Sequence, residues 1–418
     1  MKKLAFVPIV VAMAVMLLIY PENCLNSARL GLELWLTAVL PSLLPFMAAS
    51  FLLLETGIVR LIAAVFAPVT RVLFFTPGES AYVLLASALS GYPVGARLAA
   101  ELYAKGHMTE PDAQRTIRFT SVTGPVFITG AVSAGLLGLP EAGVYLSAAH
   151  YLSALLAGVL FGMYERRRGS VSSASSRCFN DAWLRFKHDA ASCPTLGAIL
   201  SSSVEKSIRA LLKIGGFIIL FSVILELLSV TGVMDVMVWA YSPLASLTGL
   251  DHAGAAALLS GSVEMTAGCA RVAALATDIN TKLVLASGIV SFGGFGIHMQ
   301  TRAVCATSGL VPKKFLAAKS VQGAVSSALT ALFLALFPIS AAASAFAATT
   351  TKTAAFGGII FAAAALVVLL LVKLWQRFSP SSSYPPAPAG SFEQALDNRQ
   401  NRSPAQLRYR RHIPSRRS

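Results

Sequence analysis

Long apolar stretches recur along the whole chain, and they limit the folds that it can adopt. Hydrophobic residues make up 55% of the chain and charged residues 13%, and the mean hydropathy of +0.67 exceeds what the core of a soluble domain requires. A helix that crosses a bilayer needs about 20 apolar residues. Stretches near that length cover residues 4–20, 30–54, 58–75, 81–104, 116–138, 143–163, 208–230, 233–249, 253–276, 283–308, 315–337 and 355–374. We therefore predict an all-α polytopic membrane protein.

One of these stretches contains a cluster of helix-breaking residues. The segment "LSGYPVGARLAAEL", residues 89–102, places Gly91, Pro93 and Gly95 before the charge of Arg97. A proline inside a helix removes a backbone hydrogen bond and costs about 3 kcal/mol, and glycine weakens the helix further. Irregular backbone inside a membrane is tolerated where it lines a cavity within the protein. The segment therefore predicts a broken or re-entrant helix that lines a site.

The break belongs to an internal repeat. The Ser-Gly pair at 90–91 recurs at 260–261, and Gly124 and Gly294 each lie 33 residues after the glycine of their pair. Both landmarks therefore share an offset of 170 residues. We infer a duplication, with breaks at 90–95 and 260–268 and facing breaks at 123–125 and 293–296.

The distribution of basic residues predicts the orientation of the two copies in the membrane. Basic residues in short loops mark the cytoplasmic side. Lys2 and Lys3, the connector at 164–205 and the tail at 376–418 are basic, so we place all three in the cytoplasm. Each copy then crosses the membrane an odd number of times, and the two copies have opposite orientations. This inverted repeat is the plan of secondary transporters, in which the ends of broken helices bind substrate and helix N-termini attract anions.

Several motifs resemble one known family. "GLELWLTAVLPSLLPF", "SGYPVGARLAAELY", "GPVFITGAV", "GSVEMTAGC" and "SFGGFGIHMQ" resemble the sporulation integral membrane proteins of the YlbJ type, over residues 28–337. The resemblance implies two nucleoside-recognition gate domains, which are similar to parts of concentrative nucleoside transporters. It further implies transport of dipicolinate across the outer forespore membrane, from the mother cell toward the forespore. The family often has asparagine before the first Gly-Pro, where this chain has Val122 and Thr123.

The candidate substrate-binding residues lie at or beside the four breaks. They are Ser90, Gly91, Tyr92, Pro93, Arg97, Thr123, Gly124, Pro125, Ser260, Gly261, Glu264, Arg271, Gly293, Gly294, His298 and Gln300. Ala-Arg at 96–97 recurs as Ala-Arg at 270–271, and each arginine either faces the site or extends to the membrane interface. Glu264 either takes part in binding or pairs with Arg271, and His298 is either structural or a proton carrier. We interpret His150 and Lys319 as interface anchors.

Nothing in the sequence indicates an enzyme. The five cysteines, at 24, 178, 193, 269 and 305, are widely spaced without a CxxC pair, so we expect no metal site and no cofactor. The net charge of +15 is explained by topology and requires no nucleic-acid partner. Two other functions remain open: an assembly or signalling factor for sporulation, and a transporter of a nucleoside-like solute.

The expected organisation has six parts. They are a retained first transmembrane helix at 1–27, a first gate-like repeat at 28–163, the cytoplasmic connector at 164–205, a second repeat at 206–337, a final transmembrane region at 338–375 and a disordered tail at 376–418. The loop at 104–115 is expected to be solvated, with a new helix beginning at Thr109. The tail is either a contact for anionic lipid or a topology signal alone.

Overall fold

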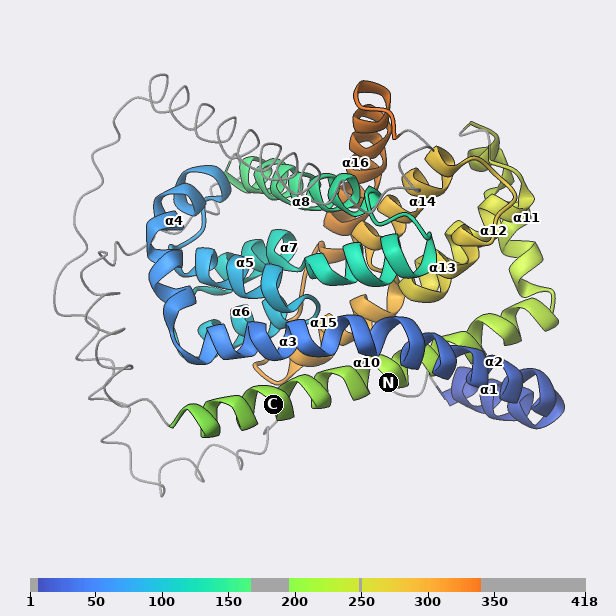
Figure 1. Ribbon diagram of the computed structural model, residues 1–418, viewed down its shortest axis with the longest axis horizontal. Helices are drawn as coiled ribbons and strands as arrows, with labels where there is room; N and C mark the ends of the chain where they lie inside the picture. Colours follow the sequence, from blue (N-terminus) through green and yellow to red (C-terminus); the bar gives the residue numbers. More distant parts are fainter. Residues whose placement is uncertain (1–6, 167–194, 248–249, 340–418) are drawn as a thin grey trace, which may run out of the picture. The chain divides into compact units, whose positions relative to one another are not determined.

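Every regular element in the described part of the chain is helical. The computed structural model describes residues 7–166, 195–247 and 250–339, and Figure 1 shows their arrangement. The first part contains α1 (Val7–Ile19), α2 (Pro21–Leu34), the π-helix η2 (Trp35–Val39), α3 (Leu40–Glu55), α4 (Ile58–Phe74), α5 (Glu79–Ser90), α6 (Val94–Ala104), α7 (Glu110–Thr120), the π-helix η3 (Phe127–Leu136) and α8 (Ala142–Arg166). The rest contains α10 (Leu196–Val230), α11 (Val233–Leu247), α12 (His252–Val263), α13 (Met265–Ala273), α14 (Ile279–Phe292), α15 (Gly294–Ala306) and α16 (Phe315–Leu336). The prediction of an all-α membrane protein is confirmed.

Five helical segments are long and apolar enough to cross a membrane. They are Pro21–Glu55, Ala142–Arg166, Leu196–Val230, Ile279–Ala306 and Phe315–Leu336, and a sixth candidate is a pair of helices, Leu61–Phe74 and Glu79–Ser90, bent by 104°. Several of the twelve predicted stretches are therefore halves of bent or broken segments. The stretch at 355–374 lies outside the described residues, as do most of the connector and the whole tail.

The predicted breaks are present in the fold. Between α5 and α6, Gly91 has a φ of +74° and the Tyr92–Pro93 peptide bond is cis. Between α12 and α13 a single extended residue, Glu264, turns the chain. Residues 121–124 separate α7 from the helical segment that leads into η3, and Gly293, at a φ of +85°, separates α14 from α15. Glycine is needed at 91 and 293 because other residues rarely adopt a positive φ.

The order of the helices follows the offset of 170 residues. Helices α3 to α8, with η3, precede the connector, and their counterparts at this offset are the second half of α10 and then α11 to α16. The packing follows the same relation, because counterpart helices pack on partners that are themselves counterparts. Helix α6 packs on α15, and its counterpart α13 packs on η3. Helix α7 packs on α16, and its counterpart α14 packs on α8.

Two helices extend beyond the expected boundaries. The helix that begins at Pro21 passes through residue 27 without a break and continues to Glu55. Helix α10 begins at Leu196, ten residues before the expected start of the second repeat, because Thr195 caps it by accepting a hydrogen bond from the backbone N–H of Ala198. Two serines of this helix, Ser203 and Ser207, are buried.

Helix α10 lies along α2 and α3, as Figure 1 shows. The ring of Trp35 occupies the space beside Gly215, and its Nε1 donates to the carbonyl oxygen of Leu211 at 3.1 Å. A side chain at position 215 would overlap that ring. This contact fixes α10 as one wall of the site described next.

Candidate functional site

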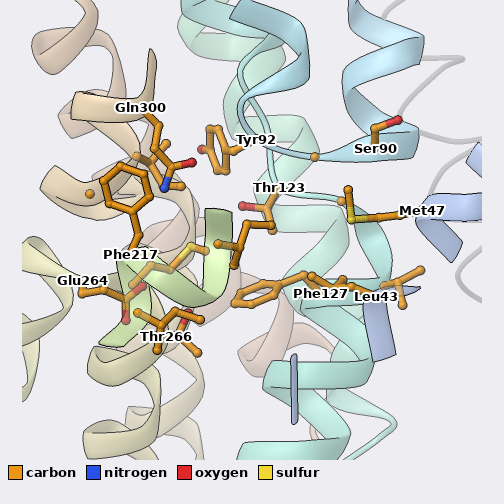
Figure 2. Close-up of a pocket in the computed structure, with 18 of the residues that line it drawn as sticks. Leu43, Met47, Ser90, Tyr92, Thr123, Phe127, Phe217, Glu264, Thr266 and Gln300 are labelled. Carbon is orange, nitrogen blue, oxygen red and sulfur yellow. The ribbon is translucent and has the colours of Figure 1, made fainter. Parts of the chain in front are cut away.

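The breaks of both halves meet at one pocket, shown in Figure 2. Its walls come from α3, α10 and the residues at the breaks, and the space between them, including its opening, is about 740 Å³. The lining residues are Leu43, Phe46, Met47, Leu89, Ser90, Gly91, Tyr92, Thr123, Gly124, Val126, Phe127, Ile214, Phe217, Ile218, Phe221, Glu264, Met265, Thr266, Gly296, Ile297 and Gln300.

Close backbone contacts bring the breaks together. A Cβ atom on Gly91 would lie 3.0 Å from the backbone nitrogen of Gly124, so the two breaks of the first half touch. In the second half, a Cβ on Gly294 would lie 2.9 Å from the carbonyl oxygen of Gly261, and a Cβ on Gly268 would lie 2.1 Å from the Gly261 Cα. Close backbone therefore disfavours a side chain at Gly91, Gly268 and Gly294, of which Gly91 and Gly294 are landmarks of the repeat.

Hydrogen bonds hold the first-half breaks in place. The Ser50 hydroxyl donates to the carbonyl oxygen of Leu89 at 2.9 Å, and the Tyr151 hydroxyl donates to the carbonyl oxygen of Thr123 at 2.8 Å. Thr123 also donates through Oγ1 to the carbonyl oxygen of Val290 at 3.4 Å, which links the two halves. The Ser90 hydroxyl is buried and forms no hydrogen bond with the described residues. Its donor is thus unused among the described residues.

Glu264 caps the helix that follows it. Its carboxylate oxygen Oε2 accepts a hydrogen bond from the backbone N–H of Ala267 at 2.6 Å, and the side chain is largely buried. Among the described residues it forms no ion pair with Arg271, which lies in the last turn of α13. The partial positive charge of the α13 N-terminus is thus directed at the protein's own carboxylate, whereas α6 begins without a side-chain cap.

The predicted site residues divide into three groups. Ser90, Gly91, Tyr92, Thr123, Gly124, Glu264 and Gln300 line the pocket. Pro93, Pro125, Ser260, Gly261, Gly293 and Gly294 form or flank the breaks without lining it, and Arg97, Arg271 and His298 lie apart from it. The two arginines are not equivalent, since Arg97 is in the first turn of α6 and Arg271 in the last turn of α13. The side chain of Arg97 is 66% exposed and pairs with Glu101 at 3.2 Å.

The side chain of His298 packs among aromatic rings and does not line the pocket. Its ring centroid lies 4.9 Å from that of Phe292 and 5.1 Å from that of Phe315. Its Nε2 atom is buried without a hydrogen bond to the described residues.

The interpretation of His150 and Lys319 as interface anchors is wrong, because both side chains are fully buried beside the breaks. Lys319 Nζ donates to the carbonyl oxygen of Ser121 at 2.8 Å and to Gln322 Oε1 at 2.5 Å. His150 Nε2 accepts from the backbone N–H of Thr123 at 3.0 Å, and its Nδ1 lies 2.8 Å from Ser291 Oγ. His150, from α8, thus links the breaks of both halves, and Lys319 ties α16 to the first-half break at Ser121.

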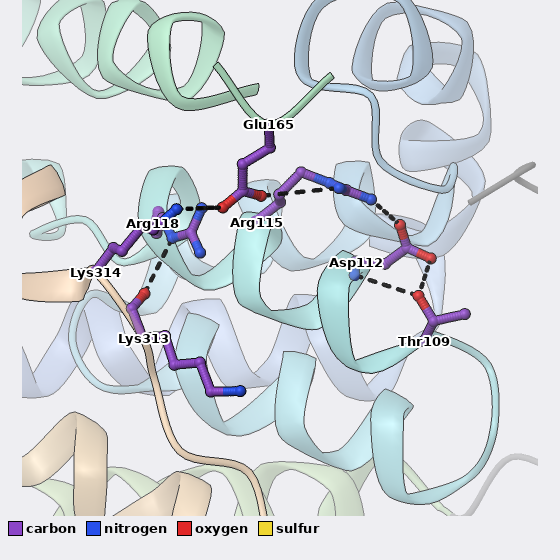
Figure 3. Close-up of polar contacts among 7 residues, drawn as sticks. All are labelled: Thr109, Asp112, Arg115, Arg118, Glu165, Lys313 and Lys314. Atoms are coloured by element: carbon purple, nitrogen blue, oxygen red, sulfur yellow. Dashed lines mark hydrogen bonds and ion pairs between the residues drawn. The ribbon is translucent and has the colours of Figure 1, made fainter. Parts of the chain in front are cut away.

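The sequence interpretation also missed a buried charge cluster, shown in Figure 3. Glu165 at the end of α8 accepts a hydrogen bond from Arg118 Nη1 at 2.7 Å, and Arg115 pairs with Asp112 at 2.5 Å. Lys314, before α16, completes the cluster 3.4 Å from Glu165. Helix α7 begins after Thr109 as predicted, but the expectation that this loop is solvated is wrong at Asp112, because its carboxylate is buried against Arg115.

The described residues contain no group of three or more histidine, cysteine, aspartate or glutamate side chains that could hold a metal ion.

Comparison with known proteins identifies the family. Sporulation integral membrane protein YlbJ of Bacillus subtilis (strain 168) is 34% identical over 313 residues, which are 73% of this chain and 76% of that protein. This chain belongs to the YlbJ family of sporulation integral membrane proteins. Residues 36–140 also match the Gate family model, described as nucleoside recognition, and they run from η2 to the end of η3.

Two solved structures of CNTnw align with this YlbJ-family chain at 16% identity. A variant in its intermediate 1 state has a TM-score of 0.43 over 74% of this chain and 77% of that one. An inward-facing substrate-bound state has a TM-score of 0.45 over 77% of this chain and 85% of that one.

Proposed function

We propose that this YlbJ-family protein is a membrane carrier for a small anionic solute, with dipicolinate as the substrate, moved from the mother cell toward the forespore. The observation that carries the proposal is the pocket to which the breaks of both halves contribute. Transporters built from repeats place their substrate at such an interface, between discontinuous helices. A catalytic role is not part of the proposal.

An inverted relation between the halves would let the pocket face each side of the membrane in turn. Support comes from α8 and α16, which are counterparts at the offset of 170 residues and run antiparallel. Gln322 Nε2 donates to the carbonyl oxygen of His150 in the first half of each helix, while Lys314, just before α16, contacts Glu165 at the end of α8. The start of one helix therefore lies at the end of the other.

The lining of the pocket suits a flat aromatic anion. Phe127, Phe217 and Phe221 supply apolar faces for a ring, and the Ser90 hydroxyl and the Gln300 amide are the hydrogen-bond donors in the lining for carboxylates. The carboxylate of Glu264 repels an anion in the pocket less strongly than a free carboxylate would, because it is bound to the N-terminus of α13, which carries a partial positive charge.

We propose that the protein lies in the outer forespore membrane and that its connector faces the cytoplasm. The charged residues of Figure 3 gather where α8 ends and the connector begins, together with the exposed ion pair of Lys313 and Glu110 at 2.9 Å. Basic residues at this end agree with the positive-inside rule. Contact between the tail and anionic lipid remains part of the proposal.

Uptake by purified protein in sealed vesicles tests the carrier directly. Vesicles would be loaded with a lanthanide that luminesces on binding dipicolinate, and uptake compared with that of a nucleoside. Ile214→Trp fills the pocket from α10, and Leu212→Trp, two residues earlier on the exposed face of that helix, is the matched control. We expect the first variant to abolish uptake and the second to retain it. Uptake of the nucleoside but not of dipicolinate would show that dipicolinate is the wrong substrate. Uptake of neither solute would refute the proposal that the protein is a carrier.

The cellular test separates transport from assembly. In sporulating cells without this protein, we expect dipicolinate to accumulate in the mother cell and to be absent from the spore. Ile214→Trp should reproduce that defect at a normal protein level, whereas an assembly factor would tolerate a filled pocket. Normal loading of dipicolinate in cells without the protein would refute the assignment.

A further inference from the structure

We propose that Lys319 supplies the positive charge that makes the pocket select anions, acting through the wall formed by Tyr92 and the loop at 121–124. The inference rests on the proposed function and deepens it, because it names the residue that distinguishes a charged solute from a neutral one of the same shape.

The position of Lys319 is unusual for a lysine. Its side chain is fully buried in α16, and no carboxylate of the described residues lies within ion-pair distance of it. Charged groups within a membrane protein usually pair with one another or mark a substrate pathway. Lys319 Nζ has a carbonyl and an amide oxygen as acceptors but no carboxylate among the described residues, which leaves its charge to be compensated by an anion in the pocket.

The contacts of Lys319 suit an ammonium group. Two of its hydrogens point at acceptors, the carbonyl oxygen of Ser121 at 2.8 Å and Gln322 Oε1 at 2.5 Å, and Nζ lies 5.0 Å from the centroid of the Tyr92 ring. The amide of Gln322 is oriented by its own Nε2, which donates to the carbonyl oxygen of His150 at 3.3 Å. All three partners are acceptors or an aromatic face, so they match a group with three donors and no lone pair.

The titratable neighbours do not supply this charge. The hydrogen bond from the backbone of Thr123 to His150 Nε2 requires that atom to be unprotonated, which assigns the proton of a neutral ring to Nδ1, facing Ser291. His298 is packed between phenylalanine rings, and Arg97 and Arg271 lie away from the pocket. Lys319, by contrast, contacts both breaks of the first half, at Tyr92 and at Ser121.

Lys319 lies directly behind the pocket wall. Tyr92 and Thr123 line the pocket, Tyr92 carries the aromatic face next to Nζ, and Ser121 is two residues before Thr123. A charge separated from the solute by one ring and excluded from water acts more strongly than the same charge in solvent. A neutral solute gains nothing from it, and a cation is repelled.

Three pyridine solutes test the proposal: dipicolinate, the neutral pyridine-2,6-dicarboxamide of the same shape, and the smaller monoanion pyridine-2-carboxylate. Wild-type protein in vesicles should bind the dianion best and the neutral amide worst. Lys319→Met should weaken dipicolinate binding by at least about tenfold while leaving the neutral amide unchanged. Lys319→Arg should retain most of the preference, and Lys206→Met, which alters an exposed lysine, is the control.

A second variant keeps the test decisive if Lys319→Met fails to fold. Gln322→Glu places a carboxylate where Gln322 Oε1 already accepts from Lys319, so it neutralises the ammonium without changing the size of either side chain, although it also removes the donor to the carbonyl oxygen of His150. It should reduce the preference for dipicolinate over the neutral amide as Lys319→Met does. An unchanged preference in a folded variant would show that Lys319 only joins the halves, and the inference would fail. A wild-type protein that moves none of the three would refute the carrier itself.

Discussion

The two halves contain the same pair of helices but hold it together with different chemistry. In the first half, α7 is fixed to α8 by an ion pair, with Arg118 Nη1 2.7 Å from Glu165. In the second half, the counterparts α14 and α16 meet through small residues, where Gly288 faces Gly323 and the hydroxyls of Ser287 and Ser326 lie 2.8 Å apart. Position 288 is the counterpart of 118, so glycine stands where the first half has arginine. The architecture is therefore compatible with either charge pairing or close packing.

The breaks that line the pocket also differ between the two halves, in the length of the connection between their helices. Three residues, 91–93, separate α5 from α6, whereas Glu264 alone separates α12 from α13. The shorter connection forces α12 and α13 into contact at Gly261 and Gly268, and the counterpart of Gly268 in the first half is Leu98. The second-half break is thus the tighter of the two, and it should tolerate substitution least.

The largest effect is expected from Gly268→Ala. The added methyl group would lie 2.1 Å from the Gly261 Cα, a contact that only movement of backbone can relieve. We expect a loss of more than about 3 kcal/mol of the free energy of unfolding, at the upper end for overpacked sites. Thermal unfolding in detergent measures it. Gly216→Ala, where nothing lies within 4 Å of the new atom, is the control and should unfold like wild type. Equal stability of the two variants would show that the second break is as loose as the first.

Glu165→Gln is expected to have the next largest effect. It removes the acid that Arg118 and Lys314 share, and breaking a buried ion pair leaves uncompensated charge at a cost of about 3 kcal/mol. The exposed pair of Arg209 and Glu205 provides the control, since Glu205→Gln should change stability by less than about 0.5 kcal/mol in screened solvent. If Glu165→Gln is equally mild, packing rather than charge holds the first half as well.

The breaks could be predicted from sequence because glycine and proline act locally. A positive φ at Gly91 and Gly293, and a carbonyl oxygen 2.9 Å from where a Cβ on Gly294 would lie, each favour a residue without a side chain, and glycine is visible in the sequence. Seven of the predicted residues line the pocket, and two of them, Gly91 and Gly124, are glycines of these breaks.

The burial of Lys319 and Asp112 depends on contacts between distant segments, and the sequence alone did not reveal it. Lys319 lies in the second turn of α16, a position typical of a side chain that extends to the interface. One available signal was missed: Asp112, Arg115 and Arg118 recur at every third residue and so share one face of α7. Charges that share one helix face and lead into an apolar stretch are compatible with a buried charge cluster, and not only with a solvated loop.

His150→Ala should have an intermediate effect on both halves at once. It removes the acceptor of the Thr123 backbone N–H and the partner of Ser291, and an unsatisfied buried donor costs about 1–3 kcal/mol. We expect thermal unfolding at lower temperature together with slower uptake. His252→Ala, at the exposed start of α12, is the control. A variant with normal stability and uptake would show that the two breaks do not depend on this link.

The smallest effect is expected from Arg97→Ala, which separates the two sources of positive charge beside the first break. Arg97 is exposed and pairs with Glu101 one turn along α6, and such a pair contributes at most about 0.5 kcal/mol after solvent screening. Because its side chain does not line the pocket, dipicolinate binding should remain at the wild-type level while Lys319→Met weakens it. Binding isotherms for the two variants, measured beside Glu101→Ala, decide the matter. If Arg97→Ala weakens binding and Glu101→Ala does not, the anion is drawn to the exposed end of α6, and the charge behind Tyr92 is not what selects it.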